Sequence, residues 1–161
     1  MRKRKRGKHK PKICFAASSG GHFEQLMMLR PLMDRYESFI LTEKTLYQAD
    51  VPGMRVYLLK KVIPIDRFYI PWTMVNILHS LLIFLKERPD AVISTGVFVT
   101  VPICVFAKLF GKKVIYIESF AKVTSPTKTG RFLYKFADRF YVQWESMLEV
   151  YPNAKCLGGI Y

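Results

Sequence analysis

The chain alternates between short, continuous runs of apolar residues and longer segments in which apolar residues recur every three or four positions. The short runs are typical of buried strands, and the longer segments predict helices. We expect six strands, at residues 13–18, 39–42, 56–59, 91–94, 114–117 and 140–142. We expect five helices, at residues 22–36, 71–86, 99–110, 130–138 and 145–150, followed by a tail at 155–161.

Strands that are apolar throughout, rather than at alternate positions, indicate a parallel sheet covered by helices on both faces. The sequence therefore predicts one α/β domain over residues 13–161, with a Rossmann-like, doubly wound parallel sheet. Ligands of such folds bind beyond the carboxyl ends of the strands, near the point where the strand order reverses. Three loops are expected at that edge, at residues 18–22, 94–96 and 118–119.

The first loop contains Ser18, Ser19, Gly20, Gly21 and His22. Two consecutive glycines allow the backbone to approach a ligand closely. A histidine at this place could act as a general base towards a hydroxyl nucleophile. The alternative is a tight turn between strand and helix, with a histidine that only caps the helix.

The other two loops contain Thr95-Gly96 and Glu118-Ser119. Glu118 ends an apolar strand, where a carboxylate is unfavourable unless it is paired or exposed. It could bind acceptor hydroxyls or serve as an alternative base, or it could cap a helix or pair with a lysine. Thr95-Gly96, taken alone, fits a simple turn.

Charge is concentrated at one end of the 161-residue chain, which has 26 Lys and Arg, 12 Asp and Glu, and a net charge of +14. Eight of the basic residues lie in residues 1–12, and they include Arg2, Lys3, Arg4, Lys5 and Arg6. Without these eight, 18 basic residues remain against 12 acidic ones, a net charge of +6. We therefore expect a disordered basic arm over residues 1–12 and a mildly basic folded body.

The arm has three interpretations: a phosphate-binding tail for nucleic acid, a polybasic patch on an anionic membrane, or a solubilising tail. The helix that begins at Pro71 bears on this choice, because Thr73, Asn76, Ser80 and Glu87 form a narrow polar stripe on a segment that is otherwise almost entirely apolar. Such a helix is either buried on most sides or lies in a membrane interface. The apolar residues expected there include Trp72, Leu78 and Leu82.

Neither a signal peptide nor a stretch of about 18–20 apolar residues is expected. The odd number of cysteines, Cys14, Cys104 and Cys156, indicates reduced core thiols in a cytoplasmic protein. We expect no metal and no cofactor, and no nucleic acid as a partner, since the folded body offers no basic recognition helix.

Three segments carry a resemblance that is more specific than any single loop: KICFAASSGGHFEQLMML, DAVISTGVFVTVPICVFAKLFGKKVIYIES and GRFLYKFADRFYVQW. In this order they resemble the membrane-anchoring subunit of the split N-acetylglucosaminyltransferase of the dolichol pathway. They resemble more closely its homologues in bacterial capsule and exopolysaccharide biosynthesis. The order of motifs is also similar to the acceptor half of the peptidoglycan lipid-linked N-acetylglucosaminyltransferase.

The resemblance implies the N-terminal, acceptor-side half of an inverting GT-B glycosyltransferase divided between two polypeptides, attached to the cytoplasmic face of the cell membrane. A donor-binding subunit would hold the UDP-sugar, and the acceptor would be linked to a polyprenyl diphosphate. The six expected strands account for one Rossmann-like unit. The alternative is a non-catalytic membrane scaffold that recruits and activates the catalytic subunit.

The resemblance also assigns residues to the shared cleft. It places His22 as the base or a positioning group, and Glu118 at the acidic strand end. Substrate contacts are expected from Ser18, Ser19, Gly20, Gly21, Thr95, Gly96 and Ser119. The partner interface is expected in the tail, at Leu157, Gly158, Gly159, Ile160 and Tyr161.

Two departures from related enzymes bear on the mechanism. The eukaryotic subunit has an N-terminal transmembrane helix where this chain has the basic arm, so we expect peripheral attachment. An Asp-x-Asp motif is absent from the sequence, so a metal-dependent GT-A mechanism has no support.

Overall fold

The computed structural model describes residues 10–45, 51–62 and 67–161. Arg2, Lys3, Arg4, Lys5 and Arg6, the basic residues assigned to a membrane-binding arm, lie outside these described residues. Lys12, the expected last residue of the arm, is instead the first residue of the first strand. It belongs to the fold because its ammonium group pairs with two glutamates, Glu37 at 2.8 Å and Glu87 at 3.2 Å.

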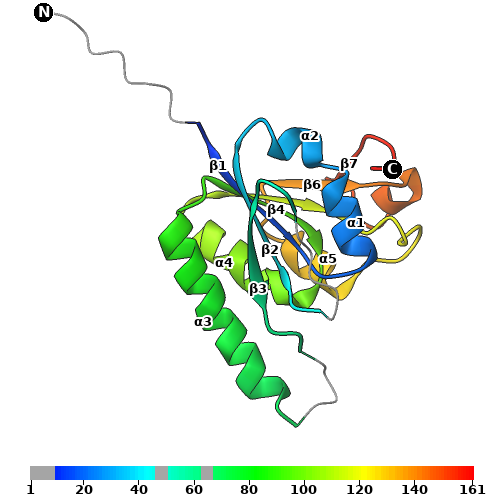
Figure 1. Cartoon of the computed structure of the whole chain (residues 1–161). Coiled ribbons are helices and arrows are strands. Elements are labelled where there is room, and N and C mark those ends of the chain that lie inside the picture. Colours follow the sequence, from blue (N-terminus) through cyan, green and yellow to red (C-terminus); the bar gives the residue numbers. More distant parts are fainter. Residues whose placement is uncertain (1–9, 46–50, 63–66) are drawn as a thin grey trace, which may run out of the picture.

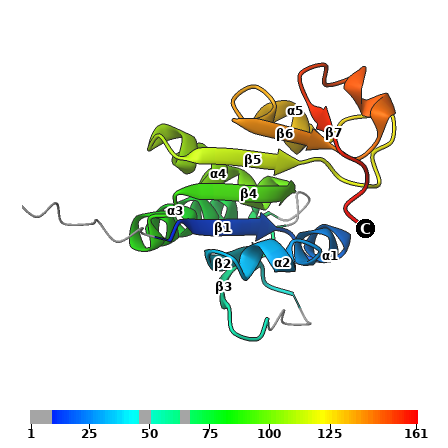
Figure 2. The ribbon, with the colours of Figure 1, turned by 90° about the horizontal axis from the view of Figure 1, so that it is seen from above.

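All strand pairs among the described residues are parallel, in the order β3-β2-β1-β4-β5-β6-β7. This arrangement confirms the predicted Rossmann-like sheet. Figure 2 shows β1, β4, β5 and β6 pointing the same way, toward the side where α1 and the C-terminus lie. The strands are β1 (Lys12–Ala17), β2 (Glu37–Glu43), β3 (Arg55–Leu59), β4 (Ala91–Gly96), β5 (Lys113–Ile117), β6 (Arg139–Val142) and β7 (Lys155–Cys156).

Helices cover both faces of the sheet (Figure 1). They are α1 (Gly21–Met27), α2 (Arg30–Met33), α3 (Tyr69–Glu87), α4 (Val101–Leu109) and α5 (Lys128–Leu133), with 3-10 turns η1 (Phe98–Thr100) and η2 (Glu145–Leu148). Alternate residues of β1 serve the two cores. Cys14 and Ala16 pack with α3, α4 and α5, whereas Phe15 packs with α1 and α2. This double burial explains why β1 is apolar at every position from 13 to 17.

The structure differs from the sequence prediction most clearly at three places. The helix expected at 22–36 is two short helices, because Pro31 has no backbone N–H to continue the helix and instead opens α2. The expected last helix at 145–150 is the 3-10 turn η2. The tail expected at 155–161 begins with a seventh strand, β7, which has only two residues and therefore no sequence pattern of its own.

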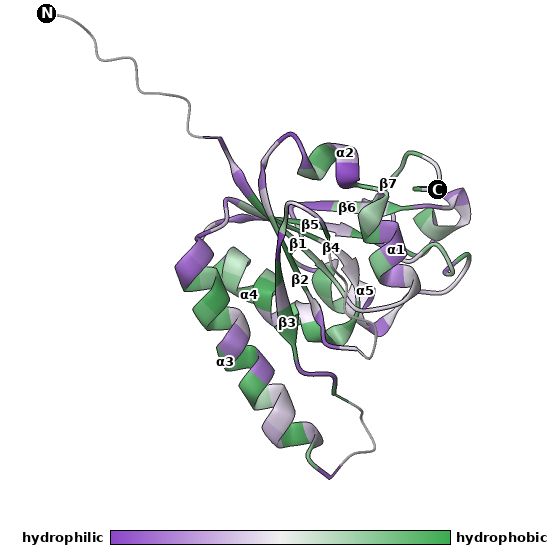
Figure 3. Ribbon diagram, viewed as in Figure 1, coloured by the Kyte–Doolittle hydropathy of each residue, from purple (hydrophilic) through white to green (hydrophobic). Residues whose placement is uncertain are grey.

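Helix α3 packs with its polar stripe inward. Asn76, Ser80 and Glu87 are buried against the sheet, whereas Leu78 and Leu82 on the opposite side are 57% and 54% exposed. Asn76 fixes the helix, since its side chain bonds both the N–H and the carbonyl of Lys60. In Figure 3 the helix runs along the outside of the molecule, coloured hydrophobic over much of its length. Of the two interpretations of this helix, burial on most sides is therefore wrong.

By length and composition α3 is the one helix among the described residues that could cross a membrane, but only 22% of its apolar window is buried in the protein. The third predicted membrane residue, Trp72, is half-buried, and the Lys60 ammonium lies 2.8 Å above its ring. This cation–π contact attaches the start of α3 to the loop after β3.

Candidate functional site

The loops after β1 and β4 meet where the order of the sheet reverses. Strands β1 and β4 are neighbours, and the register pairs Ala17 with Gly96 across a local irregularity. The residues that follow, 18–22 and 97–100, therefore leave the sheet side by side. This position is the one at which doubly wound folds bind ligands.

His22 and Thr95 hold each other by two hydrogen bonds. His22 Nδ1 lies 2.8 Å from the Thr95 carbonyl oxygen, and the Thr95 hydroxyl donates to the His22 carbonyl oxygen at 2.8 Å. A carbonyl oxygen only accepts hydrogen bonds, so Nδ1 must carry the proton. The neutral ring therefore has its lone pair on Nε2, which is the state that a general base needs.

Gly96 is required by both its conformation and its surroundings. Its φ is +120°, which side chains rarely adopt. A Cβ atom at this position would lie 3.1 Å from the Tyr116 hydroxyl and 3.3 Å from two atoms of the His22 ring. The expected Thr95-Gly96 loop is thus more than a turn, because it supports the histidine on one side and Tyr116 on the other.

The serines of the first loop have different surroundings. Ser19 is anchored by Glu43 at the end of β2, which accepts from the Ser19 hydroxyl at 2.7 Å and from its N–H at 3.3 Å. Ser18 is buried and bonds only the Ser19 carbonyl oxygen among the described contacts. Gly20, with φ +73°, and Gly21 have open space around them. Sequence reasoning missed Glu43, although a carboxylate at the end of an apolar strand is the same signal that singled out Glu118.

Glu118 is 1% exposed, and its carboxylate accepts hydrogen bonds from uncharged donors. Oε2 accepts from the Tyr151 hydroxyl at 2.9 Å, and Oε1 accepts from the Ser119 N–H at 2.9 Å. The Thr127 hydroxyl lies 3.0 Å from Oε1, and its N–H reaches Oε2 at 3.3 Å. Among the described residues no lysine or arginine pairs with it. These contacts fasten the loop after β5 to α5 and to the turn before β7.

Tyr116 connects this cluster to the histidine loop. Its hydroxyl lies 3.4 Å from Glu118 Oε1 and, on the other side, next to Gly96. Burial, and then the nearby charge of Glu118, raise the pKa of Tyr116 far above that of a free phenol. Burial and Glu118 raise the pKa of Tyr151 in the same way. Both phenols therefore keep their protons and donate them.

Two buried glutamines, Gln25 and Gln143, tie the site to the C-terminal tail. Gln143 Nε2 donates to Gln25 Oε1 at 3.2 Å and to the Glu118 carbonyl at 2.8 Å, and Gln143 Oε1 accepts from the Ile160 N–H at 2.9 Å. Sequence reasoning missed this pair. Nothing in the local pattern links residues that lie 118 positions apart.

The tail residues predicted to bind the partner lie at the same edge of the sheet. Leu157, Gly158, Gly159 and Tyr161 are exposed, and Ile160 is partly buried. Gly159 and the Tyr161 ring both pack against Phe120, with the two rings 5.1 Å apart. The tail thus presents one apolar side to solvent and is held on the other by the loop after Glu118.

Within residues 10–45, 51–62 and 67–161, no group of three or more His, Cys, Asp or Glu residues could hold a metal ion.

Solved structures with this fold include MurG of Acinetobacter baumannii, with a TM-score of 0.64 at 14% identity. The likeness covers 84% of this chain and 43% of that one. The UDP-N-acetylglucosamine 2-epimerase of Rickettsia bellii gives a TM-score of 0.68 at 12% identity, over 94% of this chain and 46% of that one. These likenesses place the fold among those of GT-B proteins.

The relatives found by sequence share the name UDP-N-acetylglucosamine transferase subunit ALG14. The human protein is 38% identical over 100 residues, which are 56% of this chain and 46% of that protein. The Yarrowia lipolytica protein is 27% identical over 95% of this chain and 83% of its own length. The chain spans less than half the length of most of these relatives. Residues 67–160 match the family described as "Oligosaccharide biosynthesis protein Alg14 like", and the chain belongs to this family.

Proposed function

We propose that this chain is the acceptor-side subunit of a two-chain, inverting, UDP-sugar-dependent glycosyltransferase. The acceptor is a sugar on a polyprenyl diphosphate, and the biological setting is capsule or exopolysaccharide biosynthesis. The name shared by the relatives favours UDP-N-acetylglucosamine as the donor. A second subunit binds that donor, forming a heterodimer with this chain.

The pairing of His22 with Thr95 is the observation that carries the proposal. It fixes the ring with Nε2 free to accept a proton, at the edge of the sheet where such folds bind ligands. In the reaction, Nε2 takes the proton from an acceptor hydroxyl while that oxygen forms a bond to C1 of the donor sugar. The bond from C1 to the diphosphate breaks on the opposite face, so the configuration at C1 inverts and UDP leaves with the bonding electrons.

Glu118 acts in this proposal through other residues rather than on the substrate. Its carboxylate is buried and all its contacts are with the protein, so it does not extend into the cleft as the second base considered above. It instead sets the position of Tyr116 and of the loop that follows, including Ser119. Ser18, Ser19, Gly20 and Gly21 remain the proposed acceptor contacts on the other side of His22.

Peripheral attachment to the cytoplasmic face of the membrane is supported by α3. Helix α3 buries Asn76 and Glu87 and exposes Leu78 and Leu82. This orientation is the reverse of that of a surface helix in water, which turns its apolar side to the core. An anionic bilayer would cover its apolar side and attract the basic arm, and two weak signals together anchor far better than one. The tail at 157–161 is the proposed contact with the donor-binding subunit.

The test is reconstitution with the donor-binding subunit, UDP-N-acetylglucosamine and a polyprenyl diphosphate carrying one sugar. His22→Ala is expected to lower kcat by about 100-fold or more, as loss of a general base does. His79→Ala is the matched control, because His79 is exposed on α3 and far along the chain from the site loops. Full turnover by His22→Ala would refute the catalytic role.

The alternative is a non-catalytic scaffold that recruits and activates the donor-binding subunit. The Gln143–Ile160 bond favours it, because it joins the proposed partner-binding tail directly to the site. A scaffold predicts that His22→Ala is active, whereas removal of residues 157–161 abolishes transfer. The enzyme hypothesis predicts a loss of activity in both variants, so the two outcomes separate the functions.

A further inference from the structure

Two cavities lie next to each other at the carboxyl edge of the sheet, beside the loop after β4. One has a volume of about 210 Å³ and is lined by Glu43, the start of α3 and the turn at residues 97–102. The other, of about 510 Å³, lies between the starts of α3 and α4 and helix α5. Tyr69 and Phe98 line both cavities, so the two cavities adjoin, and we name them together the Tyr69–Phe98 groove.

The wall of the groove is mostly apolar, apart from Lys128 and Thr129 in the second cavity. Its polar side chains in the first cavity are already engaged by the protein. Asn76 bonds the backbone of Lys60, Thr73 donates to the Tyr69 carbonyl, and Glu43 holds Ser19. In the second cavity the side chains of Val101 and Phe132 face the space with Phe98. A groove of this kind favours a flexible hydrocarbon over a polar ligand.

One end of the groove borders the candidate site. Val97 follows Gly96, which lies against the His22 ring, and Glu43 anchors the loop that carries Ser19. The Val97 backbone has φ +79°, a strained conformation for a β-branched residue, and it turns the chain from β4 toward the groove. An apolar ligand in the groove would therefore begin next to His22.

The second cavity adds a positive charge. Lys128 lines it and makes no ion pair with any described residue. Lys128 follows Thr127, whose hydroxyl is fixed by Glu118, so the base of this side chain is held in place relative to the site. A free lysine beside an apolar groove is complementary to a ligand that joins a hydrocarbon to an anion.

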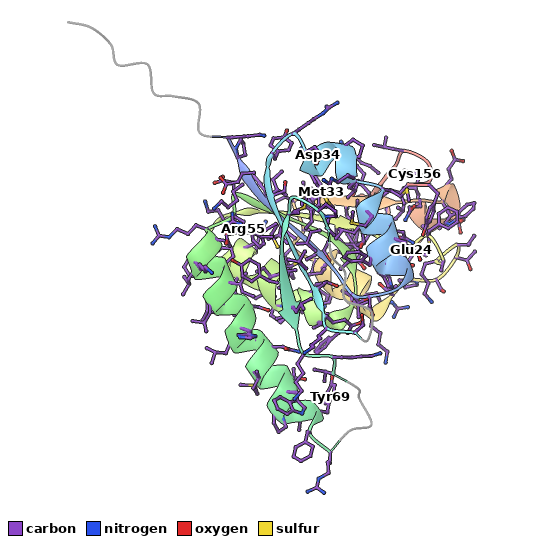
Figure 4. All side chains as sticks on the ribbon, viewed as in Figure 1. Glu24, Met33, Asp34, Arg55, Tyr69 and Cys156 are labelled. Atoms are coloured by element: carbon purple, nitrogen blue, oxygen red, sulfur yellow. The ribbon has the colours of Figure 1, made fainter. Side chains whose placement is uncertain are left out.

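The groove also leads to the apolar side of α3. Figure 4 places Tyr69 at the start of α3, at the end of the helix opposite Arg55. Ile70, directly after it, is 72% exposed and begins the row that continues through Met74 and Leu78. A hydrocarbon chain leaving the groove would meet this row rather than water.

We infer that the Tyr69–Phe98 groove binds the first isoprene units of the polyprenyl acceptor, with Lys128 facing its diphosphate. This inference rests on the proposed function, since it names where the acceptor lipid of that reaction lies. The base, the anion site and the groove then follow the order of the acceptor itself, which runs from sugar to diphosphate to hydrocarbon.

The test uses the complete two-subunit enzyme in detergent, where membrane attachment is not needed, and two acceptors with the same sugar diphosphate. One carries a full polyprenyl chain and the other a short, water-soluble alkyl chain. Phe98→Ser is expected to raise KM for the polyprenyl acceptor about 10-fold, because it removes the aromatic wall shared by both cavities. KM for the short acceptor and for the UDP-sugar should stay unchanged.

Phe110→Ser is the matched control. Phe110 is 54% exposed, against 55% for Phe98, and it lies at the end of α4 outside both cavities. It should leave both acceptors unaffected. Equal effects of Phe98→Ser on both acceptors, no effect on either, or the same loss from Phe110→Ser would overturn the inference.

Lys128→Ala tests the anion end. It should raise KM for both acceptors, because both carry the diphosphate, and Lys128→Arg should restore most of the loss. Lys135→Ala is the control, because Lys135 is an exposed lysine just after α5 and outside both cavities. A Lys128→Ala enzyme with unchanged KM values would remove the diphosphate contact from the inference.

A binding measurement separates this inference from the proposed function. A polyprenyl diphosphate with a photoreactive group on its first isoprene unit should crosslink to Tyr69, Phe98 or Val101 in the two-subunit complex. If the complex crosslinks at these residues but transfers no sugar, the groove binds the lipid and the proposed glycosyl transfer is wrong. If the complex transfers sugar but crosslinks at other residues, the proposed glycosyl transfer is supported and the lipid does not bind in the groove.

Discussion

Two buried glutamates lie at opposite edges of the sheet, and the fold satisfies them in different ways. Glu87, at the amino edge, is 3% exposed and meets two cations, with Arg55 at 2.9 Å and Lys12 at 3.2 Å. Glu118, at the carboxyl edge, is 1% exposed and meets the uncharged donors Tyr151, Thr127 and Tyr116.

The pKa of Glu87 reflects the hydrogen bond from Tyr57 as well as the two cations. Burial alone would raise the pKa of this carboxyl, but hydrogen bonds from Tyr57 and Lys12 and the charge of Arg55 lower it below its ordinary value. The amino edge is thus a cluster of ion pairs that holds the end of α3 on the sheet. At the carboxyl edge, Glu118 lies in a network of uncharged hydrogen-bond donors, near the two cavities and His22. Ion pairs support the fold at the amino edge, whereas hydrogen bonds from uncharged groups support it at the carboxyl edge.

The largest effect that we expect is from Gly130→Ala. A Cβ at this position would overlap Glu118 Oε2 and lie 2.7 Å from the Tyr151 hydroxyl and 2.9 Å from Thr127 Oγ1. The network has no room to move, so the variant should lose about 3 kcal/mol in the free energy of unfolding, measured in urea. Gly21→Ala, where a Cβ meets open space, should change it by less than about 1 kcal/mol. Equal losses would mean that the Glu118 network is loosely packed.

Gly96→Ala should affect activity more than stability. The added methyl group would press on the His22 ring and the Tyr116 hydroxyl, and the backbone φ of +120° suits glycine. Misplacing a reacting group by about 1 Å can lower kcat by about 100-fold, so a smaller displacement of His22 should lower it by about 10-fold or more. In the reconstituted assay KM for the UDP-sugar should not change. A variant with normal kcat would show that Gly96 does not support the reaction. The Thr95-Gly96 loop would then have a structural role only.

The sequence predicts much of this difference between the edges, but not all of it. Continuous apolar runs identify the six longer strands, and their parallel order brings His22, Thr95 and Glu118 to one edge. What the sequence does not reveal is which side of a helix faces inward. The polar stripe of α3 is visible in the sequence, and only packing shows that Asn76 and Glu87 bond the loop after β3 and the amino edge.

Contacts between distant segments were equally hidden. Gln25 and Gln143 belong to elements whose local patterns give no sign of a partner. The role of Glu118 depended on Tyr151 and Thr127, which no motif connects to it. Glu43 is different, because the rule applied to Glu118 identifies it equally well. The local sequence pattern therefore predicts where the polar side chains of the site lie. Their long-range hydrogen bonds, which determine the role of each side chain, are seen only in the structure.

A pair of tyrosine variants compares the two networks directly. Tyr151→Phe removes a donor from Glu118, and Tyr57→Phe removes one from Glu87 at 2.5 Å. A hydrogen bond to a charged group contributes about 1.5–3 kcal/mol. Tyr151→Phe should lose about 2 kcal/mol in the free energy of unfolding, because no cation compensates Glu118. Tyr57→Phe should lose about 1 kcal/mol, since Arg55 and Lys12 remain. The reverse order would show that the cations contribute little.

The smallest effect that we expect is on the free energy of unfolding at acidic pH. Because the folded pKa of Glu87 lies below the unfolded value of about 4.3, its ion pairs stabilise the fold above that pH and are lost as the pH falls through the folded pKa. Glu87→Gln should therefore be less stable than the parent at pH 7 but lose less further stability in urea titrations between about pH 5 and pH 3. Asp34→Asn, which removes an exposed carboxylate paired with Arg30, should change stability by less than about 0.5 kcal/mol at every pH. If Glu87→Gln lost stability in acid as steeply as the parent, the acid sensitivity would have to arise at another group. The next carboxylate to test would be Asp138. Burial raises its pKa, but the Val114 N–H and two lysines lower the pKa below its ordinary value.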